Sequence, residues 1–264
     1  MAYLVEEAVA RVIATMRDKL GEQLTIDDMA RSAMFSKFHF SRIFQRVTGV
    51  SPGRFLSALR LQEAKQLLVS TQLNVTDISL RVGYNSVGTF SSRFTRSVGL
   101  SPTTYRRLGG FTSEIPADGH RWGPGQASGT VRGRIYPSPT NPPGLVYVGL
   151  FPGRIPEGRP ARCTILERPG PYVLEHVPEG VWYALSHSIA SDPDHAIGLA
   201  TDRDTPVPFV GSCGPLTIRR DTVLNGVDLR LRPMRPIDPP VLLALLDVRK
   251  ARRSVPAMIQ DIAA

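Results

Sequence analysis

The chain has 264 residues, 42% of them hydrophobic, and carries a formal net charge of +9 at pH 7. The apolar content excludes a wholly disordered chain, and the length allows about two domains. A basic chain of this kind has either a polyanionic partner or a charge that serves solubility alone. The segment from Met1 to Leu20 lacks the pattern of a signal peptide, and no apolar run reaches the ~20 residues that span a bilayer. We therefore expect a cytoplasmic protein with no membrane partner.

The two halves of the chain differ in composition. Residues 1–108 hold 15 Lys and Arg against 8 Asp and Glu, whereas residues 109–264 hold 17 against 15. The first half also has only 2 of the 23 prolines and 6 of the 23 glycines. Because both residues disfavour helix interiors, the first half can be almost wholly helical and the second half cannot. We therefore predict two domains of different fold class.

The first half opens with a predicted helix-turn-helix. Apolar residues at helical spacing indicate an amphipathic helix over residues 2–21, which Gly21 ends. Thr25, followed three residues later by Asp28, predicts a capping box at the start of a second helix. Ser36 is placed to cap a third helix. Two short helices joined by about three residues form a helix-turn-helix.

The segment Ser36–Pro52 recurs 50 residues later as Ser86–Pro102, with 8 of 17 positions identical. Each copy reads as an amphipathic helix that ends at a glycine and restarts at Ser-Pro. The side chains predicted for the core of the two copies are Phe40, Ile43, Phe44, Phe90 and Phe94. We interpret the repeat as an internal duplication, with one recognition helix of a DNA-binding unit in each copy.

The polar face of the first repeated helix contains Lys and Arg but no carboxylate. Its members are Lys37, Phe38, Ser41, Arg42, Gln45 and Arg46. A solvated face usually mixes both signs of charge, so an acid-free face favours a phosphate-lined groove. Every amphipathic helix has a polar face, however, and this pattern taken alone leaves both interpretations open.

A long helix is predicted between the two copies, over residues 51–70. Its Ser-Pro start suits the first turn, where the missing N–H of proline costs nothing. A rigid connection of this kind can hold two recognition helices about 34 Å apart, which is one turn of DNA. A single chain could then reach two successive major grooves.

The second helix-turn-helix is predicted to open at Thr76 and Asp77 and to place Gly83 in its turn. Ile78 corresponds to Met29 at an offset of 49 residues rather than 50. The second turn is therefore predicted to be one residue longer than the first.

The stretch from Val5 to Arg107 resembles the AraC/XylS family of bacterial transcription regulators. The similarity is carried in order by SKFHFSRIF and TGVSP, by RLQEAKQLL in the long helix, and by ISLRVGY, FSSRF and GLSP in the second copy. The resemblance implies sequence-specific binding to double-stranded promoter DNA, with recruitment of RNA polymerase as the common outcome.

The resemblance also implies which side chains face DNA. They are Ser36, Lys37, Phe38, Ser41, Arg42, Gln45 and Arg46 in the first copy and Ser86, Val87, Gly88, Ser91, Ser92, Arg93 and Arg96 in the second. Family members often have Arg at the position of Ser92 and a small or apolar residue at that of Arg93. A base contact at position 92 is therefore lost, or Arg93 reaches phosphate instead. The small residues 86–88 favour reading of thymine methyl groups or DNA shape; the alternative is a helix that only docks on the backbone.

The second half reads as a linker followed by strands. Residues 109–129 are rich in Gly, Pro and Ser and have no period, as expected of a linker. Short apolar runs separated by turn residues then predict a β-sandwich or barrel. These runs lie at 131–136, 145–151, 162–166, 172–177, 181–188, 209–212 and 227–231. Residues 172–185 are predicted to form a hairpin around Pro178-Glu179-Gly180.

The strand order resembles the carboxypeptidase-regulatory-like, transthyretin-type β-sandwich over residues 130–233, through VRGRIYP, VYVGLF, GPYVLEHVPEGVWYALS and VDLRLRP. A last helix is predicted from Val241 to about Arg253, with a basic end that suits the helix dipole or, alternatively, contacts DNA. The predicted fold class is multidomain α plus β. An all-α double helix-turn-helix domain occupies residues 1–108, and an all-β sandwich with a C-terminal helix occupies residues 130–264.

No catalytic or metal site is predicted. His187, Asp192 and the acids after them form a polar cluster without the spacing of metal ligands. There is no nucleophile elbow and no phosphate-binding glycine loop, so we expect neither an enzyme nor a cofactor. Cys163 and Cys213 are expected to be reduced and buried. We predict a transcription regulator whose second domain senses a small-molecule effector or, alternatively, dimerises the chain or binds another protein.

Overall fold

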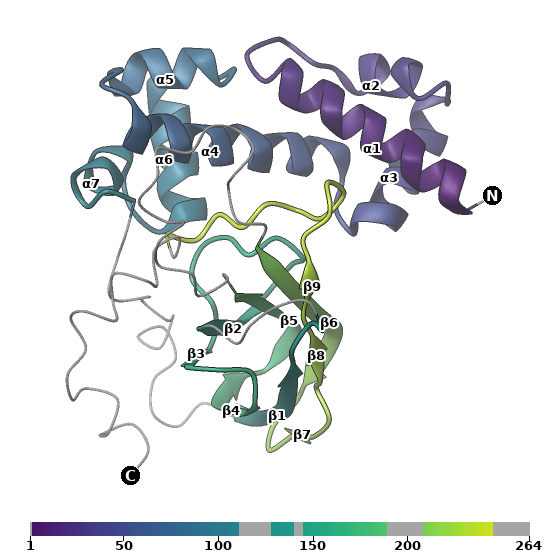
Figure 1. The fold of residues 1–264 in the computed structure, drawn as a ribbon, viewed down its shortest axis with the longest axis vertical. Helices are drawn as coiled ribbons and strands as arrows, with labels where there is room; N and C mark the ends of the chain where they lie inside the picture. Colours follow the sequence, from purple (N-terminus) through teal and green to yellow (C-terminus); the bar gives the residue numbers. More distant parts are fainter. Residues whose placement is uncertain (1, 111–127, 140–144, 189–207, 245–264) are drawn as a thin grey trace. The chain divides into compact units, whose positions relative to one another are not determined.

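The structure is a computed structural model and describes residues 2–110, 128–139, 145–188 and 208–244 (Figure 1). The chain divides into two compact units. The helical unit comprises Met1–Gly109, Phe151–Pro160 and Met234–Leu243, and the β unit comprises Gly110–Leu150, Ala161–Pro233 and Ala244–Ala264. Two short segments that were expected in the second domain therefore belong to the helical unit. Within the described ranges, no helix is long and apolar enough to cross a membrane.

The helical unit is built around one long helix. Its described helices are α1 (Ala2–Asp18), α2 (Ile26–Ser32), α3 (Lys37–Thr48), α4 (Pro52–Ser70), α5 (Val75–Arg81), α6 (Val87–Val98) and α7 (Pro102–Arg107). In Figure 1, α4 runs between α2 and α3 at one end and α5 and α6 at the other. The long helix therefore covers the range predicted for it.

The first helix-turn-helix, α2 and α3, begins with the predicted capping box. The Asp28 backbone N–H donates to Thr25 Oγ1 at 3.2 Å, and the Thr25 backbone N–H donates to Asp28 Oδ2 at 3.0 Å. The hydrogen bonds from the Thr25 hydroxyl and backbone lower the pKa of the Asp28 carboxyl. Helix α3 ends at Gly49, whose φ of 79° lies in the left-handed region that favours a residue without Cβ.

The second helix-turn-helix, α5 and α6, repeats this layout with a longer turn. Residues 33–36 separate α2 from α3, whereas residues 82–86 separate α5 from α6, which confirms the extra residue. Asn74, and not Thr76, caps α5: its side chain accepts from the Asp77 backbone N–H at 2.8 Å. The cap therefore stands at the same offset of 49 residues from Thr25 as the apolar positions do.

The aromatic core is alike in the two copies. All five side chains predicted for it are buried, namely Phe40, Ile43, Phe44, Phe90 and Phe94. The Phe44 ring packs edge-on against Phe55 of α4, and the Phe94 ring packs likewise against Tyr105 of α7, each with centroids 5.5 Å apart. A buried Phe contributes about 3–5 kcal/mol relative to Ala. The inner face of each repeated helix therefore fixes it to the scaffold.

Contacts near α4 join the two copies. Arg60 of α4 donates from Nε to the Leu20 carbonyl at 3.0 Å and from Nη2 to the Glu22 carbonyl at 2.8 Å. Gly83, in the second turn, approaches the same loop so closely that a Cβ there would collide with the Leu20 carbonyl oxygen. The loop after α1 is thus held between the long helix and the second turn.

The β unit contains two sheets. Its strands are β1 (Ser128–Tyr136), β2 (Val146–Phe151), β3 (Cys163–Leu166), β4 (Pro171–Pro178), β5 (Gly180–Ser188), β6 (Phe209–Ile218), β7 (Val223–Leu224), β8 (Leu229–Arg230) and β9 (Arg232–Pro233). One sheet has the order β4-β1-β7, with β8 also paired to β1, and the other has the order β3-β2-β5-β6-β9. Val131, Leu174, Val148 and Ala184 lie in one apolar core to which both sheets contribute. A separate β-rich region thus forms as predicted.

The predicted hairpin around residues 178–180 is wrong. Strand β4 pairs antiparallel with β1, in the register Gly133↔Tyr172, whereas β5 pairs antiparallel with β6, in the register Leu185↔Ser212. The two strands that flank the turn therefore belong to different sheets. Alternation of apolar residues shows which face of a strand is buried, but it does not show which strand is the neighbour.

The helix predicted from Val241 does not begin there. Residues 241–244 are not helical, and residues 245–253 lie outside the described part of the chain. The Leu242 N–H donates to the Pro156 carbonyl at 3.0 Å, and the Val241 and Leu243 carbonyls accept from Lys65 Nζ. In a helix that began at Val241, these two carbonyls would instead accept from N–H groups four residues later. At the linker, β1 already begins at Ser128, and residues 111–127 are not described.

Candidate nucleic-acid interface

The outer face of α3 presents the side chains predicted for the first copy. Those that are exposed are Ser36, Lys37, Phe38, Arg42, Gln45 and Arg46. Ser41 is partly buried, and its hydroxyl donates to the Lys37 carbonyl at 2.9 Å within the same helix. Since the Phe-rich face is turned inward, this polar face is the one that is open to a ligand.

The cations on this face are available for phosphate. In the described chain, neither Arg42 nor Arg46 takes part in an ion pair. Lys37 Nζ lies 3.0 Å from Asp27 Oδ2, with both side chains about half exposed. An exposed pair of this kind contributes at most about 1 kcal/mol, so a phosphate can replace the carboxylate at little cost.

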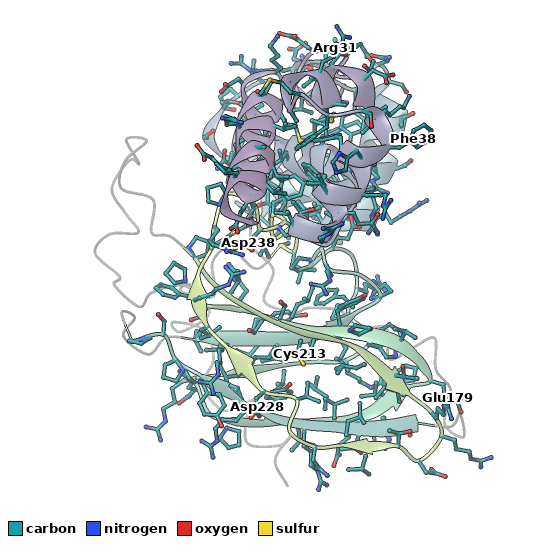
Figure 2. The ribbon with its side chains drawn as sticks, turned by 90° about the vertical axis from the view of Figure 1, so that its right-hand side faces the viewer. Arg31, Phe38, Glu179, Cys213, Asp228 and Asp238 are labelled. Atoms are coloured by element: carbon teal, nitrogen blue, oxygen red, sulfur yellow. The ribbon has the colours of Figure 1, made fainter. Side chains whose placement is uncertain are left out.

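Two large apolar side chains project near the start of α3. Phe38 is 82% exposed and points away from the helical unit (Figure 2), and Met34, in the preceding turn, is 85% exposed. Met34 has a φ of 57°, which is uncommon for a residue other than glycine. Apolar groups at this place can contact the methyl group of thymine in a major groove. The exposure of Met34 could not be predicted from the sequence, because a turn has no period from which exposure can be inferred.

The corresponding face of α6 is smaller and less charged. Its exposed members from the predicted set are Ser86, Val87, Gly88, Ser92 and Arg96, and Ser91 is partly buried. Ser86 Oγ accepts from the Thr89 backbone N–H at 3.3 Å and so caps the helix, whereas Ser36 makes no such bond to α3. The Ser86 hydroxyl is therefore engaged in capping its helix, whereas the Ser36 hydroxyl is not.

Arg93 has a partner within the helical unit. Its Nη2 lies 3.9 Å from Glu157 Oε2, and its side chain is 31% exposed. Arg96, three residues on, is exposed and forms no ion pair with any described residue. Arg96 is therefore the open cation of α6, and a phosphate contact by Arg93 stays a prediction.

The chemistry of this surface is that of binding. Among the residues that the structure describes, no three His, Cys, Asp or Glu side chains are arranged to hold a metal ion. Asp192 and the acids after it lie outside the described ranges. Cys163 and Cys213 are free and half-buried, and burial raises the pKa of the Cys163 thiol.

Known proteins match the helical half of the chain. A helix-turn-helix domain model matches residues 29–108. The HTH-type transcriptional activator AarP of Providencia stuartii is 31% identical over 98 residues, which are 37% of this chain and 73% of AarP. The DNA-binding domain of AdpA, solved with a target DNA, is 31% identical with a TM-score of 0.37, over 38% of this chain and 90% of that one. An AraC-type regulator from Chromobacterium violaceum is 27% identical with a TM-score of 0.38, over 39% of this chain and 92% of that one.

A duplicated helix-turn-helix with acid-free outer faces defines a sequence-specific DNA-binding transcription regulator. Its similarity to AarP, which extends over most of that protein, shows that the chain belongs to the family of AraC-type helix-turn-helix regulators. The chain spans only 37% and 28% of the length of two other curated relatives. The β unit lies outside the residues that the helix-turn-helix model matches.

Proposed function

We propose that α3 and α6 enter two successive major grooves on one face of promoter DNA, so that a single chain reads both halves of its site. The observation that carries this proposal is the duplication itself. Two copies with the same aromatic core are joined through α4 in one compact unit, and each turns a helix face without carboxylates outward. A duplex with a phosphate every few ångströms is the partner that suits such faces.

In this proposal α3 and α6 contribute unequally to DNA recognition. Helix α3 reads bases through Phe38, Ser41 and Arg42, and Lys37 and Arg46 bind the phosphates beside them. Helix α6 brings the small residues 86–88 to the groove floor, with Ser91, Ser92 and Arg96 along its flank. It mainly sets the register of the chain on DNA.

The β unit is proposed to modulate DNA binding, as a sandwich of the transthyretin type that takes a small-molecule effector. Support comes from the connectivity: residues 152–160 and 234–243 directly follow β2 and β9 in the chain and belong to the helical unit. A second chain or another protein bound to the β unit is the alternative occupant. Recruitment of RNA polymerase is the proposed outcome at the promoter.

Selection of binding sites from random double-stranded DNA with the full chain tests this function. The expected product is a site of two unlike halves whose centres lie about 10 base pairs apart. The affinity for that site should fall steeply with salt, because each neutralised phosphate contributes about −0.9 to the slope of log K against log salt. Failure to enrich any sequence would exclude specific reading. Enrichment of a single half would exclude α6 from the second groove.

A further inference from the structure

The segment 151–160 meets α6 at its last turn. Gly158 donates its backbone N–H to the Ser97 carbonyl at 2.6 Å. The carbonyls of a last helical turn have no partner within the helix, so this bond satisfies one of them. Ser97 also donates its hydroxyl to Glu157 Oε2 at 2.8 Å. One residue of α6 is thus bound through both its backbone and its side chain.

The Glu157 carboxylate connects α6 to α4. Its Oε1 accepts from Arg54 Nη2, on the first turns of α4, at 2.8 Å, while its Oε2 takes the Ser97 bond and faces Arg93. The Glu157 side chain is only 18% exposed, so these interactions are partly shielded from water. A charge-assisted bond at each oxygen holds the carboxylate between two helices.

The same segment reaches the end of α3. Arg154 lies so close to Gly49, the residue at which α3 ends, that a Cβ on Gly49 would collide with the Arg154 side chain. The segment therefore touches the C-terminal ends of both helices that face DNA. Arg46 lies three residues before Gly49, and Arg96 directly precedes Ser97, so the exposed cations of both helices are close to these contacts.

The segment 234–243 supports this arrangement from the same unit. Lys65 of α4, which is 1% exposed, donates from Nζ to the Leu243 carbonyl at 2.9 Å and to the Val241 carbonyl at 3.3 Å. The Leu242 N–H in turn donates to the Pro156 carbonyl, one residue before Glu157. The two segments are therefore bonded to each other as well as to the helices.

We propose that Glu157 is a positioning residue of the DNA interface: through Arg54, Ser97 and Arg93 it sets the orientation of α6 against α4, and so decides whether the second half of the DNA site is read. This inference rests on the proposed placement of α6 in a groove. It also gives Arg93 a role that requires no contact with DNA, since Arg93 turns to Glu157 while Arg96 stays open.

The test compares the wild-type chain with Glu157→Ala and Glu157→Gln. The matched control is Glu167→Gln, which removes the same charge from an exposed side chain of the β unit. Binding is measured to the selected site and to versions with either half scrambled. In the wild type, scrambling either half should weaken binding about tenfold or more. In Glu157→Ala, scrambling the second half should change binding less than about twofold, while scrambling the first half keeps its full effect. Full discrimination at the second half in Glu157→Ala would overturn the proposal.

Hydrogen exchange of the free protein gives a readout that does not need DNA. Loss of the carboxylate should speed exchange of amides in residues 90–98 about tenfold and leave residues 40–48 unchanged. Unchanged protection at 90–98 would overturn the positioning role, and so would an equal loss in both helices, which would make Glu157 merely structural. If the wild type reads no second half while the exchange result holds, the groove assignment of α6 fails and the control of its orientation by Glu157 stands.

Discussion

In the first copy the outer face of α3 carries Lys37, Arg42 and Arg46, whereas the matching face of α6 carries Val87, Ser92 and Arg96. Both inner faces have two fully buried Phe rings, but the buried Ile43 of the first copy corresponds to the partly buried Arg93 of the second. The two Phe positions are therefore shared between the copies, whereas Lys37 and Arg42 of the outer face correspond to Val87 and Ser92. Packing restricts a buried side chain to one shape, but a helix face that binds a ligand can change with that ligand.

The largest expected effect tests whether the buried aromatic rings stabilise the two copies equally. Phe44→Ala and Phe94→Ala each remove a fully buried ring that packs edge-on against one other aromatic ring. Each should lower the free energy of unfolding by about 3–5 kcal/mol. Urea denaturation followed by the helical circular-dichroism signal measures both. A difference of more than about 2 kcal/mol between the two variants would show that the copies are held unequally.

Lys65 lies on α4 and belongs to neither copy. Burial lowers the pKa of its ammonium from 10.5 to about 7. Between these values the unfolded chain binds more protons than the folded one, so stability rises with pH and is lost again as the pH falls towards 7. From pH 7.5 to 9.5 the gain should be about 2–3 kcal/mol. The free energy of unfolding of Lys65→Met, measured by urea denaturation, should not show this gain. An equal rise with pH in the two proteins would contradict the lowered pKa of Lys65.

The outer faces of α3 and α6 are expected to differ in how much DNA affinity is lost when a side chain is removed from each. Arg42→Ala should weaken binding to the selected site by about 1–3 kcal/mol and reduce specificity at one base pair. Ser92→Ala, in the second copy, should cost less than about 0.5 kcal/mol, because no long side chain reaches the groove there. Arg11→Ala, on the exposed side of α1, controls for the loss of one charge. Equal losses of DNA affinity in Arg42→Ala and Ser92→Ala would contradict the proposal that α3 does most of the base reading.

The smallest expected effect compares the caps. Thr25→Ala and Asn74→Ala each remove a side-chain bond to the start of a short helix and should each cost about 1 kcal/mol. Thr25→Ala should cost slightly more, because the reciprocal bond of its capping box is weakened as well. Thermal unfolding of the two variants measures the difference. A neutral Asn74→Ala would mean that tertiary packing alone starts α5.

The sequence alone predicted what local patterns determine. The burial of Phe40 and Phe90, the capping box at Thr25 and the longer second turn all follow from spacings of a few residues. The partner of β4 and the backbone at Val241 could not be inferred this way, because both depend on which distant segment lies alongside. Glu157 shows the limit most clearly: it is 103 residues from Arg54 and 60 from Ser97, and no local pattern marks it. The roles of the outer-face residues stay predictions.

The bonds from Lys65 to the Val241 and Leu243 carbonyls have a consequence for synthesis on the ribosome. The helices of residues 2–107 emerge first, and the ammonium of Lys65 then has water in place of those carbonyls. At 5–20 residues per second, Val241 and Leu243 are made roughly 9–35 s after Lys65 itself. During that interval the nascent chain has its duplicated helices but not the segment 234–243, which bonds to Lys65 of α4. The helical unit can therefore be completed only once residues 241–243 have been translated.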